Sequence, residues 1–202
     1  MVKVDEHNPV MDKIIKKRRS IRGFKEEKLP KELIEEIIRA GMLAPYDASP
    51  FGDVKDFRSF FVFEKDSANS KKLVSILENN AKDRLKYVES LIKGKPFMKS
   101  KFQTPMNLLR IGVDKCVSGV TNAPYFIIVV ELREVSPDEH EPLAQVLQNM
   151  RLKSTALNLG FQLILLPCGN LSLISQMAGD EELMNLLGLP IRKFAINGCT
   201  IG

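Results

Sequence analysis

The chain has 202 residues, of which 44% are hydrophobic and 27% are charged, a balance typical of a globular protein with one substantial core. We therefore expect a single domain over residues 1–202. The formal net charge of +5 favours anionic ligands but is too small to indicate nucleic acid binding. Acidic residues are interspersed among the basic ones and stacking aromatics are not, so we expect no nucleic acid partner.

Cysteine and histidine usage argues against several kinds of site. Cys116, Cys168 and Cys199 are widely spaced and odd in number, which predicts neither a disulfide framework nor a metal-ligand cluster and fits a reducing cytoplasm. The two histidines, His7 and His140, are far apart and leave little material for a metal site or a catalytic triad. No apolar run approaches the roughly 20 residues of a membrane span, so we expect no membrane partner.

The first part of the chain predicts two helices and a loop. The first helix begins at Pro9 and the second at Pro30, a residue type favoured in the first helical turn. Gly41 and Pro45 end the second helix, and residues 46–56 have the composition of a loop. Each helix has an apolar stripe at helical spacing: Val10, Ile14 and Ile15 in the first, and Leu33, Ile34, Ile37 and Ile38 in the second.

The middle of the chain predicts a strand over residues 58–63 and a mostly helical segment over residues 71–92, with a break near Asn79 and Asn80. A basic segment over residues 93–114 shows no clear pattern. Residues 125–132 form an apolar run of strand length, interrupted by a single glutamate, so we expect this strand in the middle of a sheet.

The last part predicts a helix over residues 141–159 whose apolar residues are too evenly distributed for a surface helix, so we expect it to be buried on several sides. A strand over residues 161–166, a helical stretch over 171–187 and a strand over 193–201 follow. This irregular mixture of helices and strands predicts an α+β sandwich around one sheet.

The most informative segment is Arg18-Arg19-Ser20-Ile21-Arg22-Gly23-Phe24, at the end of the first predicted helix. Guanidinium groups stay charged and present a rigid fork of donors, so several of them beside a small hydroxyl can hold a phosphate and a polar ring. Two structural alternatives remain open. In the first, the arginine-rich segment is simply a solvated charged surface. In the second, Arg22 forms a surface ion pair with Glu26 or Glu27.

Four segments together, in this order, resemble the FMN-dependent nitroreductase family over almost the whole chain. The arginine motif is followed by a helix ending in Ala44-Pro45, then by Ala123-Pro124 and a buried strand, and then by a helix that carries Gln148-Asn149-Met150 and ends in Leu159-Gly160. The resemblance implies a nitroreductase-like α/β sandwich with a central mixed sheet flanked by helices.

The resemblance also implies an FMN site. Arg18, Arg19, Ser20 and Arg22 would line the cofactor, with Arg18 and Ser20 toward the phosphate and Arg22 toward the pyrimidine edge of the flavin.

A second implied contact comes from Pro167, Cys168 and Gly169, whose backbone would lie against the flavin ring. The glycine permits close approach of the backbone. The alternative is an ordinary turn between a strand and a helix, with Cys168 a packed thiol.

Two departures from the family pattern bear on this site. Ser49 stands where the family has an asparagine that meets the flavin, and a hydroxyl lacks the paired donor and acceptor of an amide. The family often has a Lys/Arg pair after the last strand, whereas this sequence stops at Gly202. We therefore expect phosphate neutralisation to depend more heavily on the first arginine motif.

The resemblance implies an FMN-dependent oxidoreductase, acting as a homodimer with two flavins at the subunit interface. NAD(P)H would reduce the flavin, and a nitroaromatic, quinone or related small acceptor would reoxidise it. No catalytic protein side chain is expected, because the chemistry takes place on the flavin. Two alternatives remain: a flavin-binding or sensing module with little or no turnover, and a basic binding protein for anionic partners. The sequence chooses neither the acceptor nor between NADH and NADPH.

Overall fold

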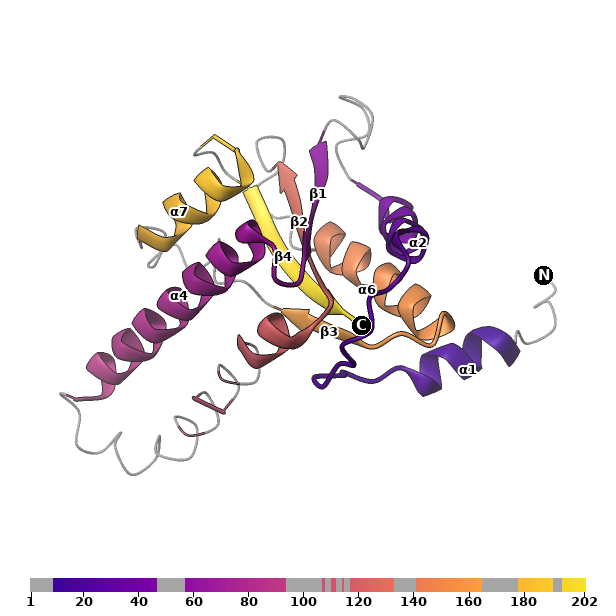
Figure 1. Cartoon of the computed structure of the whole chain (residues 1–202), viewed down its shortest axis with the longest axis horizontal. Coiled ribbons are helices and arrows are strands. Elements are labelled where there is room, and N and C mark those ends of the chain that lie inside the picture. Colours follow the sequence, from indigo (N-terminus) through magenta and orange to yellow (C-terminus); the bar gives the residue numbers. More distant parts are fainter. Residues whose placement is uncertain are drawn as a thin grey trace, which may run out of the picture.

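The computed structural model describes residues 9–46, 57–93, 107, 110, 111, 114, 117–132, 141–164, 178–190 and 194–202 (Figure 1). The elements in chain order are α1 (Pro9–Lys17), α2 (Lys31–Met42), β1 (Arg58–Glu64), α4 (Ala68–Lys93), β2 (Tyr125–Leu132), α6 (Glu141–Ala156), β3 (Phe161–Ile164), α7 (Ala178–Leu187) and β4 (Phe194–Ile201). No described helix is both long and apolar enough to cross a membrane.

The four described strands form one sheet in the order β1-β2-β4-β3. All three pairings are antiparallel, with Arg58 opposite Glu131, Ile128 opposite Gly198, and Phe161 opposite Ile201. The predicted α+β sandwich is confirmed, but its described strands pair antiparallel where a mixed sheet is predicted. The apolar run of β2 therefore reflects helices on both faces of the sheet rather than parallel pairing.

Two helix layers cover the two faces of the sheet (Figure 1). Alternation along β2 sends Ile128 into a core shared with α4 and α7, and Ile127 into a second core shared with α2 and α6. β2 is also an interior strand of the sheet, with β1 on one side and β4 on the other. The prediction of a central, buried strand over residues 125–132 is thus confirmed.

Helix α4 differs from its prediction, because it continues through Asn79 and Asn80 without a break. The side chain of Asn80 is buried, as are those of Leu73, Ile76 and Leu77 earlier in the helix. Packing of this apolar face against the sheet outweighs the modest helix propensity of asparagine.

Helix α2 packs closely on α6 at Gly41. A Cβ atom at this position would lie 2.9 Å from Cγ of Met150 and 3.2 Å from Cε1 of Phe60. The absence of a side chain therefore lets α2 approach both α6 and the sheet.

The guanidinium of Arg58 joins β1, β2 and the end of α2. Arg58 Nε donates to Glu131 Oε1 at 2.6 Å, and the two side chains are only 0% and 2% exposed. Its Nη1 donates to the carbonyl oxygens of Gly41 at 3.2 Å and Ala44 at 2.9 Å, and its Nη2 to that of Pro45 at 3.2 Å. One buried cation thus satisfies a cross-strand carboxylate and caps the C-terminal end of α2.

We expect Arg58→Met to lower the free energy of unfolding by about 3–5 kcal/mol, because the Glu131 carboxylate stays buried without this guanidinium. Urea titration followed by circular dichroism measures the loss. Replacing both residues, as Arg58→Met with Glu131→Leu, should restore part of the stability, since no buried charge then remains.

Arg39→Met is the matched control. Arg39 Nη2 lies 3.8 Å from Glu35 Oε2, and both side chains are exposed, so removing this ion pair should cost much less. Equal losses in the two single variants would contradict the role given to the buried pair.

Candidate functional site

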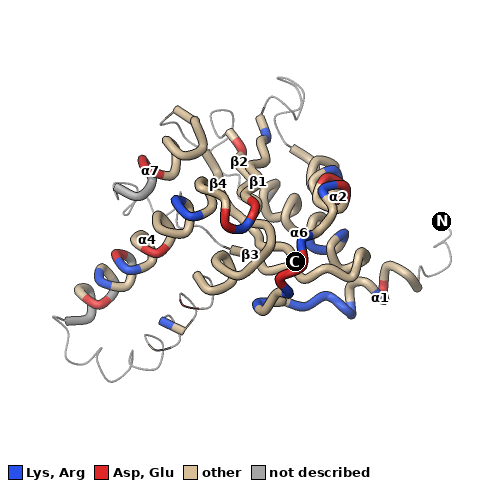
Figure 2. Tube along the Cα trace, viewed as in Figure 1, with Lys and Arg blue, Asp and Glu red and all other residues tan. Residues whose placement is uncertain are grey.

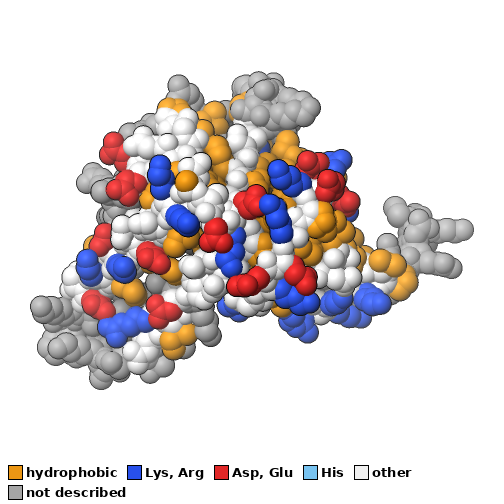
Figure 3. All heavy atoms as spheres, in the orientation of Figure 1, with side chains coloured by type: hydrophobic (Ala, Val, Ile, Leu, Met, Phe, Trp, Pro, Cys, Tyr) orange, Lys and Arg blue, Asp and Glu red, His pale blue; other side chains and the backbone are white. Residues whose placement is uncertain are grey.

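The arginine motif lies in the irregular segment between α1 and α2, and residues 18–25 of this segment are here called the strap. The backbone N–H of Ile21 donates to the carbonyl oxygen of Phe161 at 3.0 Å, which attaches the strap to the start of β3. Figure 2 shows the basic residues of this segment following α1, and Figure 3 shows Lys and Arg side chains gathered over it. Lys and Arg side chains thus concentrate where the strap meets the sheet.

Two glycines allow the strap to lie close to the sheet. Gly160 and Gly202 exchange both of their backbone hydrogen bonds. A Cβ atom on Gly160 would lie 2.9 Å from the carbonyl oxygen of Gly202 and 3.0 Å from Cγ2 of Ile21. Any side chain at position 160 would therefore push the strap away from the end of β4.

An arginine from α6, Arg151, lies beside the hydroxyl of Ser20 and near the cations of Arg18 and Arg22. Arg151 Nη2 donates to Ser20 Oγ at 2.8 Å. Burial lowers the pKa of Arg151, and the positive charges of Arg18 and Arg22 lower it further. Arg18 and Arg22 are thus close enough to Arg151 to repel its guanidinium, and these three arginines are here called the arginine face.

The arginine face has no acidic partner within the described part of the chain. No ion pair there includes Arg18, Arg22 or Arg151. Glu26, one of the alternative partners considered for Arg22, instead lies 3.8 Å from Lys65. The interpretation of Arg22 as half of a surface ion pair with Glu26 or Glu27 is therefore not supported by the described residues.

Arg19 lies apart from the arginine face. Its Nη1 donates to the carbonyl oxygens of Lys16 at 2.8 Å and Arg18 at 2.9 Å, at the C-terminal end of α1. Such a contact satisfies carbonyls left open at a helix end and is favoured by the helix dipole. The sequence predicts that Arg18, Arg19, Ser20 and Arg22 lie together. The structure groups Arg18, Ser20 and Arg22, whereas the side chain of Arg19 ends α1.

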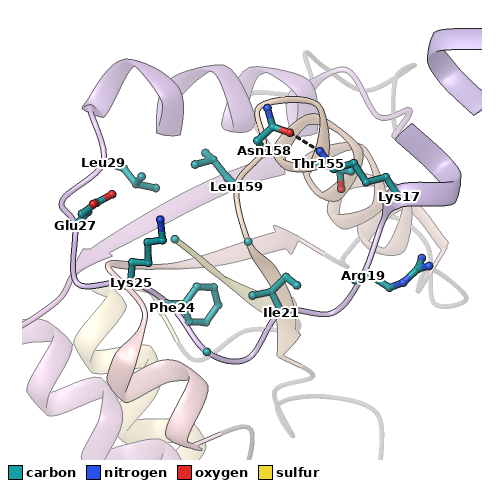
Figure 4. Close-up of a pocket in the computed structure, with 13 residues that line it drawn as sticks. Lys17, Arg19, Ile21, Phe24, Lys25, Glu27, Leu29, Thr155, Asn158 and Leu159 are labelled. Carbon is teal, nitrogen blue, oxygen red and sulfur yellow. Dashed lines mark hydrogen bonds between the residues drawn. The ribbon is translucent and has the colours of Figure 1, made fainter. Parts of the chain in front are cut away.

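A pocket of about 420 Å³ opens on the side of the strap that carries Arg19 (Figure 4). Lys17 Nζ closes one end by donating to Asn158 Oδ1. Asn158 has a φ of 58°, the left-handed conformation that often ends a helix. The lining residues are Lys17, Arg19, Ile21, Gly23, Phe24, Lys25, Glu27, Leu29, Thr155, Asn158, Leu159, Gly160 and Gly202. None of the three arginines of the arginine face lines this pocket, so the charged site and the pocket are on different sides of the strap.

The remaining predicted site residues are Ser49, Pro167, Cys168 and Gly169, and all four lie outside the described residues. Tyr46 is the last described residue before Ser49. The hydroxyl of Tyr46 donates to the carbonyl oxygen of Leu132, and its ring lies 5.8 Å from Arg58 Cζ. Within the described residues, no three side chains of His, Cys, Asp or Glu converge as a metal site would require.

Arg151 is the one member of the arginine face that no sequence motif indicates. It comes from α6, 131 residues after Ser20. One sequence feature does point to Arg151. The positions three and four residues before and after it carry Gln, Leu, Ser and Thr, so it has no acidic partner at helical spacing. A lone arginine in a helix predicted to be largely buried indicates a partner elsewhere in the fold.

The model of the Nitroreductase family matches residues 15–202. The chain belongs to the nitroreductase family. None of the curated proteins matches it.

Solved structures with this fold include two FMN-dependent nitroreductases. That of Mycobacterium smegmatis, in complex with NADPH, is 16% identical with a TM-score of 0.63, and the match covers 96% of this chain and 87% of that one. That of Clostridium difficile is 21% identical with a TM-score of 0.59, covering 94% and 84%. A nitroreductase family protein of Clostridium novyi is 20% identical with a TM-score of 0.59, covering 95% and 83%. At these identities the likeness shows the fold.

We expect Gly160→Ala to lower the free energy of unfolding by about 1–3 kcal/mol, since the added methyl group overpacks the contact between the strap and β4. Gly23→Ala is the control within the same strap, because a Cβ atom at Gly23 would meet nothing within 4 Å. Chemical denaturation of both variants measures the difference. If Gly23→Ala proves as damaging as Gly160→Ala, the close approach at Gly160 is not what holds the strap.

Proposed function

We propose that this nitroreductase-family chain is an FMN-dependent oxidoreductase that passes electrons from NAD(P)H to a nitroaromatic, quinone or related small acceptor. The arginine face supports this proposal most directly. It gathers positive charge and a hydroxyl on one side of the strap, without an acidic partner among the described residues. Such a set suits the phosphate of a flavin nucleotide.

The donors fit the group that they would hold. A phosphate monoester carries nearly two negative charges and three acceptor oxygens, and Arg18 and Ser20 would bind it with a charged fork and a short hydroxyl. Arg22, the next residue on the same side, would lie toward the pyrimidine edge of the flavin. We assign Arg19 to the end of α1, where its hydrogen bonds already are.

Bound FMN would supply the redox chemistry, taking hydride from the nicotinamide and passing electrons to the acceptor. The protein side chains would bind and orient. Arg22 would hold a fixed positive charge where the reduced flavin gains negative charge, which favours reduction. Ser49 and the backbone of Pro167, Cys168 and Gly169 remain proposed contacts of the ring. We assign no side chain a proton-transfer or nucleophilic step.

Titration of the purified protein with FMN tests the proposal. We expect flavin absorption bands that bleach when NADPH or NADH is added without oxygen. Arg18→Ala and Arg22→Ala should each weaken FMN binding about 10- to 100-fold, because each removes a charge-assisted contact. Arg39→Ala, on the exposed face of α2, is the matched control and should bind FMN as the parent chain does.

Two outcomes would contradict parts of this proposal. Unchanged FMN affinity in both Arg18→Ala and Arg22→Ala would remove the strap from the cofactor site. Flavin bands that form but persist after either nicotinamide is added would favour a flavin-binding or sensing module instead of an oxidoreductase.

We also propose a homodimer with the flavin sites at the subunit interface. Helix α1 has nine residues and none of them is buried, and Val10, Met11 and Ile15 are 64%, 46% and 50% exposed. A helix this short is marginal in water without tertiary packing, and the packing of α1 on α6 leaves these three side chains exposed. A second subunit would cover this apolar stripe and stabilise α1 beside the strap.

Analytical ultracentrifugation at micromolar concentration should show a dimer. Ile15→Gln should weaken dimerisation at least about tenfold by removing apolar area from the interface, whereas Lys13→Gln on the same helix should not. A monomeric parent chain, or equal effects of the two variants, would contradict this interface.

A further inference from the structure

Arg151 has a hydrogen-bonding capacity that the described protein does not use. Its Nη2 donates to Ser20 Oγ, but its Nε is buried and has no hydrogen-bond partner among the described residues. An unsatisfied donor of a charged group in a buried position costs substantial free energy. The guanidinium that donates to Ser20 therefore also carries an unsatisfied N–H.

The hydrogen bond between Arg151 and Ser20 also sets the direction of the serine proton. A guanidinium can only donate, so Ser20 Oγ must accept from Arg151. The hydroxyl hydrogen of Ser20 is then left to donate to another acceptor. Ser20 thus joins Arg151 as a donor, and both call for a ligand rich in acceptor oxygens.

The charges point to the same kind of ligand. Arg151 comes from α6 and Arg18 and Arg22 come from the strap, so chain folding brings like charges together across more than 120 residues. The guanidinium of Arg151 lies within the electrostatic influence of Arg18 and Arg22, and no described ion pair offsets these charges. A multiply charged anion with several oxygens would relieve this repulsion, whereas a neutral ligand would not.

We propose that Arg151 is a phosphate ligand that makes this site select a phosphorylated flavin over an unphosphorylated one. This inference deepens the proposed function and rests on it. Arg151 would bind the phosphate monoester from α6 while Ser20 and Arg18 bind it from the strap. Contacts from two separate elements would fix the position of the phosphate. If Arg151 acts on the phosphate alone, it would contribute little to the binding of the flavin ring.

Selectivity between FMN and riboflavin tests this role, because the two flavins differ only in the phosphate. Fluorescence titrations measure the affinity of each for the full chain. We expect Arg151→Gln to weaken FMN binding about 10- to 100-fold while riboflavin affinity changes less than about threefold. Arg151→Lys keeps the charge but loses the fork, and should fall between the parent chain and Arg151→Gln.

Lys153→Gln is the matched control. It removes one positive charge from the same helix, but Lys153 Nζ pairs with Glu36 Oε2 at 2.6 Å on a different side of α6. Both flavin affinities should stay at the parent value. A merely structural role for Arg151 would lower FMN and riboflavin affinity together, and that result, or unchanged FMN affinity in Arg151→Gln, would overturn the proposal.

A second measurement uses inorganic phosphate and separates this inference from the proposed function. Phosphate should raise the thermal unfolding temperature of the parent chain and of Lys153→Gln, and should do so much less for Arg151→Gln. If the parent chain binds neither flavin, the proposed function fails, yet this phosphate effect would still support an anion site that includes Arg151. If phosphate stabilises the parent chain and Arg151→Gln equally, or neither of them, the assignment of Arg151 is overturned.

Discussion

The buried guanidinium of Arg58 is the contact on which the placement of the other elements depends. It fixes β1 against β2 through Glu131 and fixes the end of α2 through three backbone carbonyls. Those carbonyls belong to residues 41–45, a few positions before Ser49 in the chain. The same side chain therefore holds the edge strand β1 in register with β2 and fixes the end of α2 against the sheet. It also fixes the residues that precede Ser49, a proposed flavin contact. Because both charges are buried, this geometry has little freedom to vary.

The strap illustrates how an irregular segment can serve two purposes at once. Ile21 joins it to β3, and Gly160 leaves room for this contact. On one side, Arg18, Ser20 and Arg22 meet Arg151, while on the other side Arg19 ends α1 and borders a pocket. Charge repulsion on the first side works against folding, so the proposed anion would stabilise the fold by binding there.

The sequence predicts the elements well wherever one physical signal dominates. The apolar run of residues 125–132 is the central strand, and the helices of residues 31–42 and 141–156 lie where their periodicity indicates. The predicted helix break at Asn79 and Asn80 is wrong because tertiary packing overrides helix propensity.

No sequence motif indicates Arg151, because its partners lie 129 to 133 positions away and local sequence patterns do not report contacts over such separations. Arg19 is grouped with its neighbours because sequence alone does not give side-chain direction in an irregular segment. The roles of Ser49, Pro167, Cys168 and Gly169 stay predictions.

The contact at Gly41 has a consequence for how such chains diverge. The side chain of Met150 occupies the space that a Cβ atom at Gly41 would need, and Met150 immediately precedes Arg151 in α6. A larger residue at position 41 would need a smaller one at position 150, or α6 would shift and carry Arg151 with it. A change at one of these two positions without a compensating change at the other would therefore be expected to alter the proposed phosphate site as well. Gly41 and Met150, two core residues, would in this way influence the proposed phosphate site through the position of α6.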